Sequence, residues 1–174
     1  ERAYKKERKT AQDLVDAIRF DTTLADRILL CSYDVPLGAK NEVVLAQKVS
    51  LREVNSHSIV NSTTHFNITD NCDIESATLV FGGIAPYPWR AKKTEKAMNG
   101  KKLSLADASQ FSKILADEVS EELNVWAERM EEVPDEGFTA EYRIQLAVSF
   151  LYKAIVNALV VKGISVPENI ESSA

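Results

Sequence analysis

The stretch that most constrains the fold is Phe81–Lys101, FGGIAPYPWRAKKTEKAMNGK, because it changes from strand-forming to helix-forming sequence within a few residues. It starts at the end of the apolar run Ala77–Phe81, whose length and β-branched content are typical of a buried strand. Gly82 and Gly83 follow, and two glycines predict a backbone that turns tightly or passes close to another segment. A strand is therefore expected to end at the first glycine.

The rest of this stretch predicts a short helix. Pro86 and Pro88 each force the preceding residue out of helical geometry, so no helix can begin before about Trp89. The sequence from Arg90 favours a helix, and Gly100 predicts its end in a left-handed turn. We interpret the stretch as a strand-to-helix joint whose residues have a structural role.

Strand patterns precede this joint. The predicted strands are Ile28–Val35, Val43–Val49, Ser58–Ile68 and Ile74–Phe81. In the third of them, alternation places four residues on one face: Val60, Ser62, Thr64 and Phe66. A short amphipathic helix, Thr10–Phe20, and a turn, Asp21–Ala25, are predicted before the first strand.

Helical patterns follow the joint. One helix is predicted from its N-cap Ser104 to about Met130 and another over Ala140–Lys162, with a loop at Val133–Gly137 between them. Strands first and helices afterwards predict an α+β fold. We expect an antiparallel sheet of roughly three to four strands, followed by about three helices packed on one face.

Composition excludes several classes of function. With 45% apolar and 27% charged residues, the chain can bury a core and is not expected to be disordered. The net charge of −5 argues against nucleic-acid and anionic-membrane partners. The longest apolar stretch, Ala147–Val161, is predicted to be too short to span a bilayer. Cys31 and Cys72 lack metal-ligand spacing and are expected to be free thiols in the cytoplasm.

The joint also resembles a known family. FGG-x-A-P followed by R-A-x-K-T-E-x-x-x-x-G-K is similar to the signature of molybdenum hydroxylase flavoproteins: xanthine dehydrogenases, aldehyde oxidases and the medium subunit of carbon monoxide dehydrogenases. Ile28–Leu30, Lys48–Glu53 and Glu141–Leu151 resemble further segments of the same family, so the similarity extends from about Arg27 to Lys162. It implies the C-terminal subdomain of an FAD domain.

The resemblance divides the chain into three expected parts. Residues 1–20 form a charged segment and short helix without a counterpart, residues 21–164 the flavoprotein subdomain, and residues 165–174 a C-terminal tail. The charged opening, without an initiator methionine, leads us to expect a piece of a longer polypeptide.

The resemblance implies a site for FAD, shared with a preceding subdomain. Leu29 matches a residue that touches the flavin, and Gln47 or Lys48, depending on the register, matches a basic residue near it. Arg52 and Asn55 match the loop near the electron acceptor, where Asn55 favours an aldehyde-oxidase-like face. The predicted cofactor-binding residues are Ile28, Leu29, Gln47, Lys48, Arg52 and Asn55.

The same residues also permit alternatives in which they have no role in cofactor binding. Ile28 and Leu29 offer the apolar wall that a flavin ring requires, and Lys48 offers a cation, but core leucines and solvated lysines are more common. His57 and His65 lack neighbouring ligands at metal spacing. We predict no catalytic residue and no metal ligand.

The longer polypeptide is here called the parent. By resemblance, it is an oxidoreductase that hydroxylates a purine or an aldehyde at a molybdenum cofactor. Electrons would pass through 2Fe-2S clusters to FAD and then to NAD or oxygen. Two cysteines cannot hold a four-cysteine cluster, so the molybdenum cofactor and clusters belong to other domains of the parent, which is expected to be a homodimer. The isolated chain is expected to be catalytically silent. The alternative hypothesis is a non-enzymatic interaction module that kept the fold.

Overall fold

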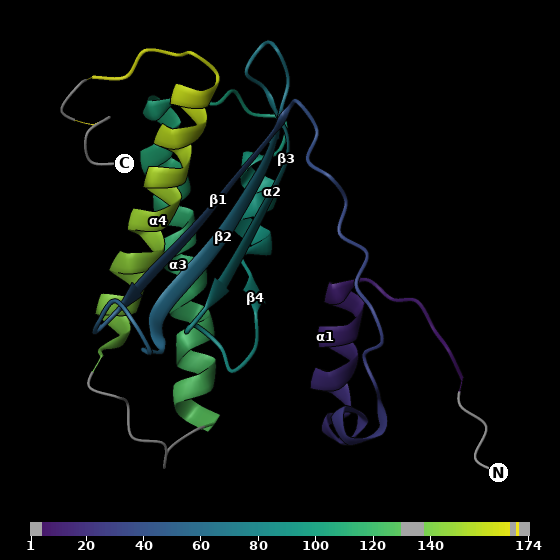
Figure 1. Cartoon of the computed structure of the whole chain (residues 1–174). Coiled ribbons are helices and arrows are strands. Elements are labelled where there is room, and N and C mark those ends of the chain that lie inside the picture. The colour runs from purple at the N-terminus through teal and green to yellow at the C-terminus, as the bar shows by residue number, and fades with distance from the viewer. Residues whose placement is uncertain (1–4, 130–137, 168–169, 171–174) are drawn as a thin grey trace. The chain divides into compact units, whose positions relative to one another are not determined.

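The computed structural model describes residues 5–129, 138–167 and 170 (Figure 1). Contacts divide the chain into two compact units, Glu1–Leu37 and Gly38–Ala174. The first unit is mainly short helical turns and irregular chain, whereas the second contains the sheet and the long helices. The division expected from the sequence, at residues 20 and 164, remains a prediction.

The first unit contains the predicted amphipathic helix, α1 (Ala11–Phe20). Thr10 caps its N-terminus through its side-chain hydroxyl. The predicted turn is the start of a 3-10 helix, η1 (Thr22–Arg27), capped by the carboxylate of Asp21. The hydroxyl of Thr23 donates a hydrogen bond to that carboxylate at 2.6 Å and holds the pKa of Asp21 below its ordinary value.

The strand predicted at Ile28–Val35 is wrong, because these residues form neither helix nor strand. Leu29 is 85% exposed, and Tyr33 and Val35 are exposed as well. A single extended segment is not stable as a strand, since it needs a neighbour for its backbone hydrogen bonds and a surface for its apolar side chains. The described residues of the first unit include no other strand to supply them.

The second unit contains a four-stranded antiparallel sheet. Its strands are β1 (Glu42–Ser50), β2 (Ser58–Ile68), β3 (Ile74–Gly82) and β4 (Trp89–Arg90), in the spatial order β1-β2-β3-β4. The first three confirm the predicted strands to within one residue at each end. The predicted face of β2 is also confirmed, since all four of its residues are buried.

Strand β4 was not expected from the sequence. The helix predicted from Arg90 begins only at Lys92, because Trp89 pairs with Phe81 and Arg90 with Val80. The ring of Trp89 packs 6.2 Å from that of Phe81 between centroids, and Trp89 is 7% exposed. Burial of the indole therefore keeps these two residues extended.

Three helices lie on one face of this sheet, which confirms the α+β fold (Figure 1). They are α2 (Lys92–Met98), α3 (Leu105–Arg129) and α4 (Ala140–Val161). Helix α2 packs on β3 and α3, while α4 packs on β1, β2 and α3. Met130 and the loop predicted at Val133–Gly137 lie outside the described residues.

Helix α4 has 22 residues, which is longer than the apolar stretch recognised in the sequence. Among the described residues it is the one helix long and apolar enough, by length and composition, to cross a bilayer. Eight of its residues are buried, including Phe150, Leu151 and Ile155. A helix at the centre of a hydrophobic core satisfies the same criteria of length and composition.

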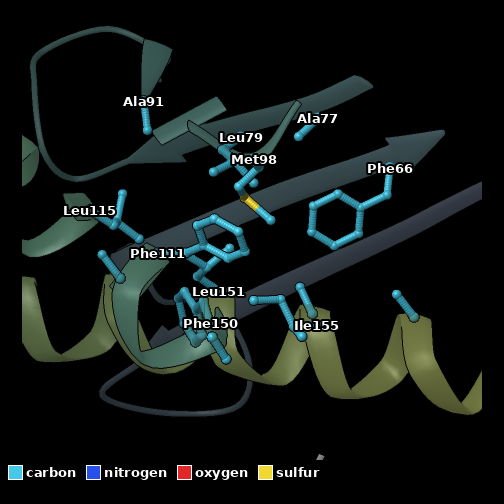
Figure 2. Packing of buried hydrophobic residues seen from close by; sticks show 14 of the residues in the cluster. Phe66, Ala77, Leu79, Ala91, Met98, Phe111, Leu115, Phe150, Leu151 and Ile155 are labelled. Atoms are coloured by element: carbon cyan, nitrogen blue, oxygen red, sulfur yellow. The ribbon is translucent and has the colours of Figure 1, made fainter. Parts of the chain in front are cut away.

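The core lies between the sheet and the helices, as Figure 2 shows. The rings of Phe66 and Phe111 and the thioether of Met98 fill it beside Leu151 and Ile155. Each such side chain contributes about 1.5–3 kcal/mol when it is removed from water. The fold therefore depends mainly on apolar contact between β2, β3 and the three helices.

A buried carboxylate joins α3 to the start of α2. Glu118, 7% exposed, accepts hydrogen bonds from the backbone N–H groups of Lys93 and Thr94 and from the Thr94 hydroxyl, each at 2.8 Å. The two N–H groups are donors that a helix N-terminus leaves without an intrahelical partner. Glu118 therefore caps α2, in place of a side chain from the preceding residue Ala91.

We expect Glu118→Ala to lower the free energy of unfolding by about 2 kcal/mol, because it leaves three donors without their acceptor. Chemical denaturation of the 174-residue chain measures this loss. The control is Glu121→Ala on the same helix. Glu121 pairs with Lys93 at the surface and raises the pKa of that ammonium, and its removal should leave the midpoint unchanged. Equal losses in the two variants would contradict the capping role.

Candidate functional site

The candidate site lies at the end of β1 and in the loop Leu51–His57, here called the β1–β2 loop. Successive residues of a strand point to opposite faces, and Gln47 and Lys48 are neighbours in β1. Gln47 pairs with Ser62 on the face that packs against the helices, whereas Lys48 is exposed on the other face. Either Gln47 or Lys48 can match the basic residue of the family, depending on the alignment. The structure gives these two residues different environments.

Two cations organise the backbone of the β1–β2 loop. The ammonium of Lys48 donates a hydrogen bond to the carbonyl oxygen of Ser56 at 2.9 Å. The guanidinium of Arg52 donates to the carbonyl oxygen of Asn55 through Nε at 3.1 Å and Nη2 at 2.5 Å. Asn55 itself has a left-handed backbone, with φ of 51°. The structure thus brings Lys48, at the end of β1, together with Arg52 and Asn55 of the β1–β2 loop.

This loop also carries two exposed aliphatic side chains that the sequence analysis missed. Leu51 is 77% exposed and Val54 is 71% exposed. The sequence carried a weak signal, since both are large apolar residues within a short polar connection. An ammonium has three donors and a guanidinium five, so each cation retains donors beyond those used within the loop. The loop can therefore offer cationic and apolar contacts to an anionic or aromatic group.

Ile28 and Leu29 lie in the first unit, outside any helix or strand. Their exposed fractions are 40% and 85%, so both side chains are accessible for contact with another surface. The other four candidates belong to the second unit. Their part in a flavin site stays a prediction.

The strand-to-helix joint supports the base of the β1–β2 loop. Gly83 has a φ of +87°, and a Cβ there would lie 2.1 Å from the carbonyl oxygen of Ile59, one residue into β2. Arg143 of α4 donates to that same oxygen at 2.8 Å and to the carbonyl oxygen of Gly83 at 3.0 Å. Both contacts fix the start of β2, where the loop ends.

A second set of contacts fixes the helical half of the joint. The carboxylate of Glu95, 6% exposed, accepts from the backbone N–H of Leu79 at 2.8 Å. It also accepts from Arg90 through Nε at 3.0 Å and Nη2 at 2.6 Å. The side chain of Asn99 accepts from the backbone N–H of Ala77 at 2.9 Å, and Gly100 has a φ of +75°. These contacts hold α2 on β3, which is the structural role expected of the joint.

Among the described residues, neither histidine lies in a cluster of potential ligands. Nε2 of His65 is 3.5 Å from the carboxylate of Glu42, and His57 is exposed in the β1–β2 loop. Within residues 5–129, 138–167 and 170, the structure shows no group of three or more His, Cys, Asp and Glu side chains that could hold a metal ion. The two cysteines, Cys31 and Cys72, belong to different units.

Comparison with known proteins identifies the second unit. A model of the CO dehydrogenase flavoprotein C-terminal domain family matches residues 46–158. This range includes β2, β3 and α2, the β1–β2 loop and the whole joint. It excludes Ile28 and Leu29.

Two longer proteins are similar in sequence. Xanthine dehydrogenase of Blastobotrys adeninivorans is 32% identical over 66% of this chain and 8% of its own length. Indole-3-acetaldehyde oxidase of Zea mays is 34% identical over 68% of this chain and 8% of its own length. The chain thus spans less than a tenth of the curated relatives it matches.

A solved structure shares the fold. The carbon monoxide dehydrogenase from Hydrogenophaga pseudoflava, in a form that lacks the Mo-pyranopterin moiety of the molybdenum cofactor, has a TM-score of 0.57 at 16% identity. The similarity covers 73% of this chain and 40% of that chain. This similarity concerns the fold. The family match over residues 46–158 shows that this chain belongs to the CO dehydrogenase flavoprotein C-terminal domain family, within the molybdenum hydroxylase flavoproteins.

Proposed function

We propose that this chain is the C-terminal subdomain of the FAD domain in a larger molybdenum-containing hydroxylase, the parent enzyme. The observation that carries the proposal is the family match over residues 46–158, which spans the β1–β2 loop and the joint that supports it. The parent enzyme is an oxidoreductase of the xanthine dehydrogenase or aldehyde oxidase type. It oxidises a purine or an aldehyde at a molybdenum cofactor.

The role of this subdomain is to form one wall of the flavin site. Lys48 and Arg52 supply positive charge for the phosphates or for the anionic reduced ring, and Asn55 adds a polar contact. Gln47 precedes Lys48 in β1 and faces the helices, so it acts on this wall only through the position of its neighbour. Leu29 with Ile28 is proposed to add an apolar surface. When bound there, FAD would supply the redox chemistry between the 2Fe-2S clusters of the parent enzyme and NAD or oxygen.

The residues present fit a shared site rather than a complete one. The β1–β2 loop is exposed, with Leu51 and Val54 open to a partner surface and Lys48 on the outer face of the sheet. A cofactor that needs many polar contacts and a closed apolar pocket requires further walls. Other domains of the parent enzyme would supply them, together with the molybdenum cofactor and the clusters. The parent enzyme is proposed to be a cytoplasmic homodimer.

The proposal predicts that the 174-residue chain alone neither binds FAD tightly nor turns over substrate. Titration with FAD, followed by flavin absorbance after gel filtration, should show no stoichiometric complex. The physical reason is that one loop offers too few contacts to offset the loss of freedom on binding. Tight binding at one FAD per chain would contradict the shared site.

Removal of the positive charge at Lys48 tests the site directly. In the parent enzyme, Lys48→Ala should weaken FAD retention by about 10- to 150-fold, because a charge-assisted hydrogen bond contributes about 1.5–3 kcal/mol. Flavin content per protein after dialysis measures this loss. Lys48→Arg keeps the charge and should retain the flavin. The matched control is Lys96→Ala, an exposed lysine on α2, which should retain it as well.

One observation favours the second hypothesis, a non-enzymatic interaction module. In the register set by Ser50, Arg52 and Glu53, Gln47 occupies the position at which the family has a lysine, and an amide carries no charge. If Lys48→Ala changes neither flavin content nor turnover of the parent enzyme, the module is the better explanation. Flavin loss in that variant supports the FAD domain.

A further inference from the structure

Three buried polar atoms lie together on the inner face of the sheet without a hydrogen-bond partner among the described residues. They are Oε1 of Gln47, Oγ of Ser62 and Oγ1 of Thr64. Ser62 is 3% exposed and Thr64 is 1% exposed. Buried polar groups in proteins are nearly always paired, because an unpaired one loses its bonds to water and gains nothing in return.

The register of the sheet places these atoms next to one another. Gln47 of β1 is directly opposite Ser62 of β2, and Thr64 is two residues further along β2 on the same face. Side chains directly opposite in an antiparallel pair have Cβ atoms about 4.5–5.5 Å apart, and diagonal neighbours are about 7–8 Å apart, still within reach of a long side chain such as glutamine. One small molecule can therefore reach all three atoms.

The neighbouring strand residues are apolar. Thr64 pairs with Leu45 of β1 and Leu79 of β3, and Ser62 pairs with Phe81 of β3. The side chains of Leu79 and Phe81 are fully buried. Helix α4 packs on β1 and β2, and it covers their inner face. The cluster is thus a polar site bordered by core side chains.

We propose that Gln47, Ser62 and Thr64 bind one internal water molecule. A buried water typically makes about three hydrogen bonds to groups that lack other partners. The water donates to the amide oxygen of Gln47 and to one hydroxyl, and it accepts from the other hydroxyl. Gln47 is only half-buried and β1 is an edge strand, so the site has a short path to solvent. The inference is independent of flavin binding.

The sign of a stability change separates a hydrated site from a dry one. Thr64→Val keeps the shape of the side chain and removes only the hydroxyl. If water is bound, the variant should lower the melting temperature of the 174-residue chain by about 2–4 °C. If the hydroxyl is dry and unpaired, its removal should raise the melting temperature instead, and this result would overturn the proposal.

Thr63→Val is the matched control, since Thr63 is the neighbouring residue on the exposed face of the same strand. It should not lower the melting temperature, because valine favours a strand at least as well as threonine. A crystal structure of the unmodified chain gives the second measurement. Water within about 2.7–3.2 Å of all three atoms supports the proposal. A direct bond between Ser62 and Gln47, with no water at Thr64, overturns it.

Discussion

Gly83→Ala should destabilise the second unit by about 4 kcal/mol or more, which is enough to unfold many domains of this size. The added Cβ would lie 2.1 Å from the backbone oxygen of Ile59, and a backbone atom cannot move aside as a flexible side chain does. The φ of +87° adds strain for any residue with a Cβ. Moving the two segments apart would also lengthen the hydrogen bonds from Arg143 to both carbonyl oxygens. Urea denaturation followed by circular dichroism measures the loss.

Gly100→Ala is the matched control for this prediction. Gly100 also has a left-handed backbone, with φ of +75°, but no atom lies within 4 Å of the position of a Cβ. The free energy of unfolding of this variant should therefore fall by about 1–2 kcal/mol, which is the conformational cost of a left-handed residue with a Cβ. The difference between the two glycines measures the close approach at Gly83. Equal losses would show that the joint does not depend on that approach.

Glu95→Ala should lower the free energy of unfolding by about 3–4 kcal/mol. The change removes a buried carboxylate that holds the backbone N–H of Leu79 and two nitrogens of Arg90. The Arg90 side chain is 29% exposed, so solvent compensates part of its loss and the effect lies in the lower part of the range for buried pairs. Denaturation at pH 7 measures the change.

Glu95→Gln refines this second prediction. The amide oxygen can still accept from Leu79, but the charge that binds Arg90 is gone, so the loss should fall between that of Glu95→Ala and zero. Changing Arg90 to alanine in the Glu95→Ala background should cost less than the same change in the unmodified chain, since the pair is coupled. Strict additivity of the two changes would contradict a coupled Arg90–Glu95 pair.

The sequence predicts β2 and α4 well because each carries a strong local period. In β2, the alternation of Val60, Ser62, Thr64 and Phe66 identifies both the strand and its buried face. In α4, the apolar residues recur at helical spacing, and the helix has the predicted start at Ala140. The spacing of apolar residues is a property of the sequence itself and does not depend on tertiary contacts. These two elements can therefore be predicted from a single sequence.

The errors fall where the outcome depends on a distant neighbour. Ile28–Val35 has the composition of a strand, but a strand also requires a paired edge and a surface to cover its apolar side chains. Trp89 and Arg90 have a helix-permissive continuation, yet pairing with Phe81 and Val80 keeps them extended. Pairing of this kind cannot be read from a window of a few residues.

The β1–β2 loop was predictable in its position and not in its detail. A loop between Ser50 and Ser58 that carries Lys48 and Arg52 at its base follows from the strand boundaries alone. The sequence does not show that both cations bind carbonyl oxygens of the loop itself, nor that Gln47 faces the helices and Lys48 faces outward. Those facts depend on register and on which face of β1 the helices cover.

The joint Phe81–Lys101 illustrates the division between sequence and tertiary structure. The sequence alone determined that a short helix follows a strand there. Glycine widens the range of backbone conformations and proline narrows it, and both effects are local. Only the tertiary structure decided why Gly83 and Glu95 are needed, since their partners, Ile59 and Leu79, lie in neighbouring strands. Backbone dihedrals are set by adjacent residues, whereas steric approach and burial of charge are set by segments that meet only in the folded chain.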